Sequence, residues 1–178
     1  MNTKEAIALV SDFNQTIDVW LTELDRYSLI QLCEKPLSAN WSVGQIYIHL
    51  LYASKYQLEQ VKVCASTNDN EWEEASAAAK TMFRNNEFPD LLIKGPHSND
   101  LTPQPQSKEQ LIKELLNLKN EINTSILDLL SSNSCRGKTK HPGLLYFNAM
   151  EWLQFAEMHL RHHLRQMKRI DEFLAPVK

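Results

Sequence analysis

Two histidines spaced four residues apart are the residues of this sequence best suited to chemistry. His159 and His163 lie in the segment EWLQFAEMHLRHHLRQM, whose apolar residues recur with a helical period. Residues four apart lie one turn above each other on a helix, so both imidazoles could bind a single metal ion. His49, at an inward position of a separate predicted helix, is the candidate third ligand. Three imidazoles leave one coordination position open, which is typical of catalytic sites.

The alternative interpretation is that these histidines are ordinary core residues. A buried imidazole commonly hydrogen bonds to a carbonyl or a carboxylate, and His49 could bond in this way to Tyr56 or to a group of the last helix. Two stacked imidazoles in an apolar stripe are harder to satisfy, because a buried polar group without a partner costs about 1–3 kcal/mol. Spacing alone leaves both interpretations open.

Three polar residues near the histidines could orient the metal ligands or a substrate without binding the metal themselves. Gln45 lies one turn before His49, and Gln166 nearly one turn after His163. His162 points about 100° away from His163 on a helix, so it cannot readily bind the same ion. We expect it behind the ligands or on the surface.

Other residues are weaker candidates for the walls of a site. His141 precedes Pro142 in an expected loop and could line the mouth of the site, although a solvated loop histidine is the alternative. Trp41, Tyr56 and Trp152 could form walls, although core packing is the alternative role for all three.

Several common chemistries are excluded by missing motifs. No glutamate follows His159 to act as the general base of a zinc peptidase, because Leu160 stands there. The sequence has no glycine-rich phosphate loop and no G-x-S-x-G nucleophile motif. Peptidase activity and a serine triad are therefore disfavoured.

Composition and charge narrow the class of protein. The chain has 178 residues, of which 43% are hydrophobic and 23% charged, with only 4 glycines. These values suit one helical domain over 1–178, large enough to fold without a structural metal. The net charge of −3 gives no basic excess, so we expect no nucleic-acid partner.

The cysteines and the apolar runs predict a cytoplasmic protein. Cys33, Cys64 and Cys135 are odd in number and lack C-x-x-C spacing, which favours reduced thiols. The apolar run near the first residue is too short for a secretory signal. No stretch approaches the roughly 18 apolar residues of a membrane span, so we expect no membrane partner.

Long helices are expected to position these residues, each about 30–40 Å in length. Three begin with a polar N-cap followed three residues later by Gln or Glu, a pattern in which each side chain caps the other's backbone amide. The expected helices span 3–29, 42–64, 107–130 and 148–174, and the capping pairs are Ser42 with Gln45, Ser107 with Gln110, and Asn148 with Glu151.

The connection between the second and third helices, 65–106, is longer than a simple loop. Its alanine-rich part, 72–83, predicts a short extra helix, and the prolines that follow predict irregular chain. A connection of this length lets the second and third helices run parallel. The segment 137–143 is expected to be a loop.

Taken in order, these residues resemble the DinB/YfiT-like superfamily over nearly the whole chain. The resemblance implies an all-α fold, a four-helix bundle with up-down-down-up connectivity and a long crossover between helices 2 and 3. It also implies that His49, His159 and His163 are the metal ligands. The segments that carry it are Trp41-Ser42-Val43-Gly44-Gln45 with His49-Leu50, His141-Pro142 with Glu151-Trp152, and HLRHHLRQ from His159 to Gln166.

The resemblance also implies a function. Members of the superfamily include thiol-S-transferases that use bacillithiol or mycothiol, and a mycothiol-dependent maleylpyruvate isomerase. It therefore implies a zinc or nickel ion that activates a low-molecular-weight thiol, or water in a hydrolase, toward a small-molecule substrate. This chain has no basic motif that identifies a particular thiol. The alternative is a non-enzymatic, stress-related bundle or binding protein, or a homodimer in which the histidines satisfy one another.

Overall fold

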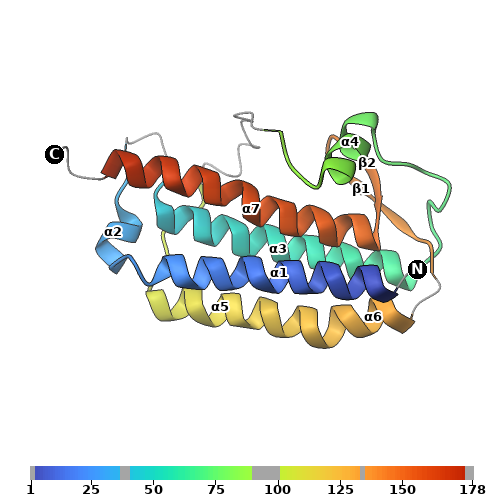
Figure 1. The fold of residues 1–178 in the computed structure, drawn as a ribbon, viewed down its shortest axis with the longest axis horizontal. Coiled ribbons are helices and arrows are strands. Elements are labelled where there is room, and N and C mark those ends of the chain that lie inside the picture. Colours follow the sequence, from blue (N-terminus) through green and yellow to red (C-terminus); the bar gives the residue numbers. More distant parts are fainter. Residues whose placement is uncertain (1–2, 37–40, 90–100, 133–134, 175–178) are drawn as a thin grey trace.

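The computed structural model describes residues 3–36, 41–89, 101–132 and 135–174. Long helices dominate these residues, as expected for the all-α class (Figure 1). His97 and part of the predicted crossover lie outside them. The long helical segments form four rods. Three are the single helices α1 (Thr3–Leu24), α3 (Val43–Ser66) and α7 (Ala149–Leu174). The fourth is made of α5 (Lys108–Glu121), the π-helical segment η2 (Ile122–Ile126) and α6 (Leu127–Ser132).

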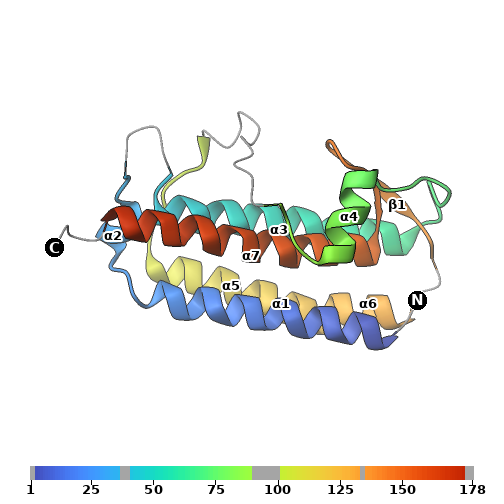
Figure 2. The ribbon, with the colours of Figure 1, turned by 45° about the horizontal axis from the view of Figure 1, so that its top comes forward.

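The four rods lie side by side around one core. In Figure 1, α1 and α7 run from right to left, and α3 and the α5–α6 rod run from left to right. Helix α3 lies against α7, and α1 lies against α7, α5 and α6. Figure 2 separates the α3–α7 pair from the α1–α5–α6 pair.

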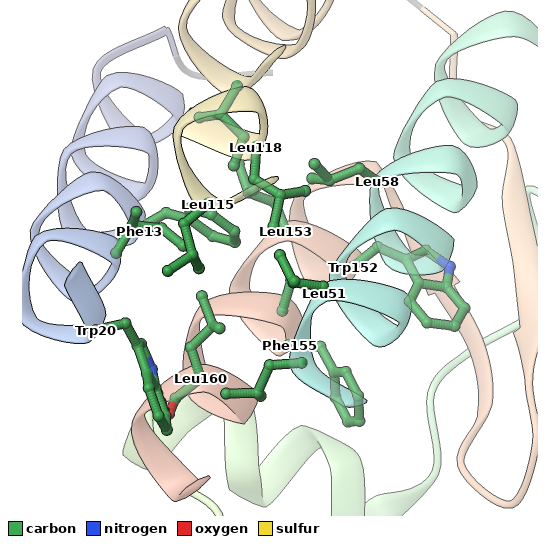
Figure 3. Packing of buried hydrophobic residues seen from close by; sticks show 14 of the residues in the cluster. Phe13, Trp20, Leu51, Leu58, Leu115, Leu118, Trp152, Leu153, Phe155 and Leu160 are labelled. Carbon is green, nitrogen blue, oxygen red and sulfur yellow. Dashed lines mark hydrogen bonds between the residues drawn. The ribbon is translucent and has the colours of Figure 1, made fainter. Parts of the chain in front are cut away.

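Aromatic and leucine side chains from all four rods fill the space between them. Figure 3 shows Phe13 and Trp20 facing Leu115 and Leu160, and these residues are at most 1% exposed. The Trp20 indole donates a hydrogen bond to the Leu160 carbonyl at 3.3 Å. This bond holds α1 against the part of α7 that carries the histidine pair.

The first predicted helix ends earlier in the structure, and a short second helix follows it. Helix α1 ends at Leu24, and α2 spans Leu29–Cys33. Ser28 caps α2 and forms a capping box with Gln31. Because the Ser28 side chain takes up a backbone amide at this point, a new helix starts here, and the prediction of one helix over 3–29 was wrong at its end.

Two segments outside the rods also differ from the prediction. The predicted loop 137–143 is the start of a hairpin in which β1 (Lys138–His141) pairs antiparallel with β2 (Leu145–Asn148). His141 therefore ends a strand. The extra helix predicted at 72–83 is α4 (Ala77–Asn85), which begins later because Ser76 is its N-cap.

The π-helical segment follows from the spacing of apolar residues in its rod. Leu118, Ile122, Ile126 and Leu130 are each at most 1% exposed and are four residues apart. In an α-helix, each step of four residues turns the apolar stripe about 40° further round the helix axis. The wider turn of η2 returns Ile126 and Leu130 to the core. Leu130 is buried in this arrangement, whereas the neighbouring Leu129 is only partly buried.

Candidate metal centre

His49 is positioned by the capped start of α3. The Ser42 hydroxyl accepts a hydrogen bond from the Gln45 amide at 3.1 Å, and the Gln45 side chain accepts one from the Ser42 amide at 3.2 Å. A methyl group on Gly44 would lie 2.7 Å from a Pro105 carbon and 2.8 Å from the Leu32 carbonyl. The missing side chain at Gly44, five residues before His49, thus lets α3 lie close against the segment around Pro105.

His159 and His163 are positioned by α7, which begins at the predicted capping pair. The Asn148 side chain accepts from the Glu151 amide at 2.9 Å, and the Glu151 carboxylate accepts from the Asn148 amide at 2.8 Å. From this start, four-residue spacing places both histidines on the face of α7 that packs against α3.

The three imidazoles converge on one point. His49, His159 and His163 each contribute one ring nitrogen, and these atoms all lie within 4.8 Å of one another. The Nε2 atoms of His49 and His159 are 3.4 Å apart, and those of His163 and His159 are 3.0 Å apart. Two nitrogens on a tetrahedral zinc ion, with bonds of about 2.1 Å, lie about 3.4 Å apart. The spacing of these atoms therefore suits a single divalent ion.

Hydrogen bonding prepares one of these rings to bind a metal. The Gln166 carbonyl oxygen lies 2.7 Å from His163 Nδ1 and can only accept, so Nδ1 carries the proton. Nε2 of His163 is then the atom with a free lone pair. His159 Nδ1 is buried and has no hydrogen-bond partner among the residues that the structure describes.

Burial keeps all three rings neutral near pH 7. It lowers the pKa of His49 to about 4. Burial, together with the neighbouring His49, lowers the pKa of His163 to about 3. The pKa of His159 falls well below its usual value, first through burial and then through the charges of the surrounding histidines. Neutral imidazole is the form that binds a metal, so the site is in its ligating form at physiological pH.

The arrangement fits a bound cation better than it fits the core-histidine alternative. A single proton shared between two Nε2 atoms makes one hydrogen bond between two of the imidazoles. The Nε2 lone pair of the third imidazole then still faces another ring nitrogen. A divalent ion would satisfy all three nitrogens at once. The donor set and the Gln166 contact therefore match a metal held by His49, His159 and His163.

Of the remaining polar candidates, His162 lies outside the triad and Gln45 is occupied elsewhere. Arg165 donates to His162 Nδ1 at 3.1 Å, which holds that ring beside the site. The Gln45 side chain bonds the Ser42 amide and the Thr102 carbonyl. Because both ends of its amide serve the start of α3, the expectation that Gln45 orients a ligand gains no support.

Aromatic rings surround the triad, and the sequence had indicated only some of them. Trp41 contacts His49, with 4.9 Å between ring centroids. Phe155 stacks on His159 at 6.3 Å with an interplanar angle of 18°. Phe88 lies 6.1 Å from His159 and was not anticipated, because it reaches the site only through the folding of the crossover.

The other residues expected to form walls, His141, Trp152 and Tyr56, lie in a chain of ring contacts that continues from Phe155. His141 contacts Phe155 at 4.8 Å and Trp152 at 5.4 Å. Trp152 is 1% exposed and contacts Tyr56, which is 48% exposed. His141 is thus part of an aromatic cluster rather than a solvated loop residue.

The sequence that carries this site matches a known protein family. The sequence model of the DinB superfamily matches residues 12–167. The chain belongs to the DinB superfamily. The matched region contains all three histidines, and this DinB protein carries them at one point in its core. No curated protein matches the chain.

Within the part of this DinB protein that the structure describes, no helix combines the length and the apolar character that crossing a bilayer requires.

Proposed function

We propose that this protein is a metal-dependent enzyme of the DinB superfamily, acting as a thiol-S-transferase. One observation carries the proposal: the convergence of His49, His159 and His163, whose ring nitrogens lie within 4.8 Å of one another. The cofactor we propose is a divalent zinc or nickel ion. The substrates are a low-molecular-weight thiol and a small electrophile.

The chain's residues and the ion have separate roles in this proposal. A divalent ion on three neutral imidazoles supplies a Lewis acid that lowers the pKa of a thiol or water at its open position. Gln166 holds the His163 ring in its ligating tautomer. Trp41 lies against the His49 ring and Phe155 against the His159 ring, so apolar surface borders both ligands.

The carboxylate nearest to the triad in sequence favours a thiol over water as the nucleophile. Glu157 is 2% exposed and accepts hydrogen bonds from Thr16 at 2.8 Å and from Arg161 at 2.6 and 2.7 Å. It is therefore engaged in binding α1 to α7 and is poorly placed to accept a proton from water. A thiol ionises nearer to neutral pH and depends less on such a base.

Two further features belong to this proposal. We propose the up-down-down-up connectivity of the superfamily, supported by the helix directions in Figure 1. We also propose a cytoplasmic location, supported by Cys64, whose buried thiol hydrogen bonds to Thr139 and to the Phe147 carbonyl. The reduced form of Cys64 thus has a place in the core.

The test is a metal-dependent thiol conjugation. Protein prepared without a His-tag should conjugate bacillithiol or glutathione to a chromogenic electrophile faster when loaded with zinc or nickel than when metal-free. His49→Ala should fall to the metal-free rate, because it removes one ligand. His162→Ala is the matched control and should keep most of the rate.

Two other results would change the assignment. Ester or amide hydrolysis that depends on His159, without any metal-dependent thiol reaction, would assign a hydrolase. Tight metal binding without either reaction would assign a non-enzymatic metal site.

A further inference from the structure

An aromatic residue of the crossover, Phe88, lies beside the triad and is held there by its own set of contacts. Phe88 follows α4 and lies against three rings of α7, namely Phe155 at 4.9 Å, His162 at 5.6 Å and His159 at 6.1 Å. It is only partly buried. A partly exposed ring against a candidate ligand is in a position to contact whatever binds beside it.

Polar side chains of α7 fasten the chain that carries Phe88. Gln154 donates to the Phe83 carbonyl at 3.0 Å, and Arg161 donates to the Asn86 carbonyl at 2.9 Å. Nearest to the ring, Arg165 donates to the Phe88 carbonyl itself at 3.1 Å.

Arg165 makes more hydrogen bonds around Phe88 than Gln154 or Arg161 does. Its guanidinium also bonds the Glu87 carboxylate at 2.8 Å and His162 Nδ1 at 3.1 Å. One planar group thus fixes the main chain of Phe88, the side chain before it and the imidazole beneath it. Such a fork is stiffer than a single bond.

Beyond Phe88, a row of ring contacts leads away from the triad along α7. From Phe155 the ring contacts continue through His141 and Trp152 to Tyr56. Burial lowers the pKa of His141, so at neutral pH this row carries no imidazolium charge. An apolar or aromatic group is the chemistry that such a row accommodates.

We propose that Phe88 is a specificity-determining residue of the metal site, with Arg165 as its positioning residue, and that the site takes substrates with an apolar ring next to the metal-binding atom. This inference rests on the proposed metal centre. The donor atom binds at the triad and the ring packs against Phe88 and Phe155. Small polar thiols lack this second contact.

The test compares two thiols on cobalt-loaded full-length protein, because cobalt(II) reports a bound thiolate through its absorption spectrum. The probes are phenylmethanethiol and 2-mercaptoethanol, which present the same donor atom with and without a ring. The wild type should bind phenylmethanethiol at least about tenfold more tightly, as expected for burying a ring. Phe88→Ala should bring the two affinities within about threefold of each other, because the ring contact is lost.

Further variants separate specificity from folding. Phe88→Leu keeps an apolar side chain and should retain part of the preference. Arg165→Ala should weaken the preference by lowering the affinity for phenylmethanethiol, and Arg165→Lys should restore some of it. The matched controls are Trp72→Ala, which removes an aromatic side chain that is 85% exposed, and Lys168→Ala, which removes an exposed cation of α7. Both should behave like the wild type.

Each contrary result has a distinct meaning. Absence of a cobalt spectrum, or of any thiolate spectrum, would overturn the proposed function and this inference together. Cobalt binding with equal affinity for the two thiols, or an undiminished preference in Phe88→Ala, would overturn only the inference.

Discussion

Gln166 decides which nitrogen of His163 faces the other imidazoles. Its carbonyl oxygen accepts from Nδ1 at 2.7 Å, which leaves Nε2 unprotonated. A ligand ring that is free to change tautomer or to rotate would bind a metal less well. The sequence identified this residue from its spacing, one turn beyond the ligand.

Replacing Gln166 should therefore weaken metal binding without removing a ligand. For Gln166→Leu we expect a loss of about 10–100-fold in zinc affinity. This is the usual range when a group that hydrogen bonds to a metal ligand is removed. Gln166→Glu keeps an acceptor at Nδ1 and should retain wild-type affinity or exceed it. Competition with a chromogenic chelator measures both, and equal affinity of Gln166→Leu and the wild type would contradict this role.

The histidines should also make the metal-free protein sensitive to mild acid. Their pKa values in the folded protein, about 4 for His49 and about 3 for His163, are below the ordinary value of 6.5. Between pH 6.5 and these values the unfolded chain binds more protons, so stability falls as pH decreases through this window. From pH 7 to pH 5 the expected loss is on the order of 2 kcal/mol for each imidazole that stays neutral in the fold.

Urea unfolding of metal-free protein at several pH values measures this loss. His49→Phe removes one of the titrating groups and should flatten the dependence. A free energy of unfolding that is the same at pH 7 and pH 5 would show that the rings titrate normally.

At the scale of helices, Gly44 lets the first turn of α3 pack closely against Pro105 and Leu32. A glycine in a helix is ordinarily less stable than alanine by about 0.5–1 kcal/mol. Here an added methyl group would meet Pro105 at 2.7 Å and the Leu32 carbonyl at 2.8 Å. Overpacking of this kind typically costs about 1–3 kcal/mol and should exceed the helical gain.

Gly44→Ala should therefore destabilise the protein by about 1–2 kcal/mol. Because the first turn of α3 must move away from Pro105, we also expect weaker metal binding through His49. Thermal unfolding and zinc titration measure the two effects. Gly44→Ala with a higher melting temperature than the wild type would mean that the contact relaxes at no cost.

The helices that carry the site could be predicted from the sequence better than the connections that complete it. The pairs Ser42 with Gln45 and Asn148 with Glu151 mark the starts of α3 and α7, and the structure forms both capping boxes. Ser28 with Gln31 has the same pattern, yet the apolar period on either side concealed the break between α1 and α2. The hairpin of β1 and β2 has strands of only four residues, too short to show an alternating pattern.

Over the whole molecule, the site depends on contacts between distant segments. The triad brings His49 of α3 to His159 and His163 of α7. Four-residue spacing could predict only that the two histidines of α7 lie together. Phe88 could not be predicted, because its place follows from hydrogen bonds that α7 donates to carbonyls of the crossover. Local patterns define helices, whereas these bonds exist only after the helices have packed.

Metal binding should stabilise the whole bundle, because the triad bridges α3 and α7. A ligand that binds only the folded state raises stability by about 2.7 kcal/mol at 100 times its Kd. Titrating zinc or nickel into metal-free protein should raise the melting temperature progressively. His163→Ala should abolish this rise, and His162→Ala should keep most of it. No rise at millimolar metal would favour the non-enzymatic alternative.

The wide turn of η2 has a consequence for chain length. The Leu127 amide bonds the Ile122 carbonyl across five residues, one more than in an α-helix. The rod therefore contains one surplus residue. Deleting exposed Thr124 would let an ordinary helix bury Leu118, Ile122 and Ile126 at alternating spacings of four and three, as a regular core stripe requires. This deletion should be tolerated, whereas deleting Lys113 from the regular part of α5 should rotate half of the stripe out of the core.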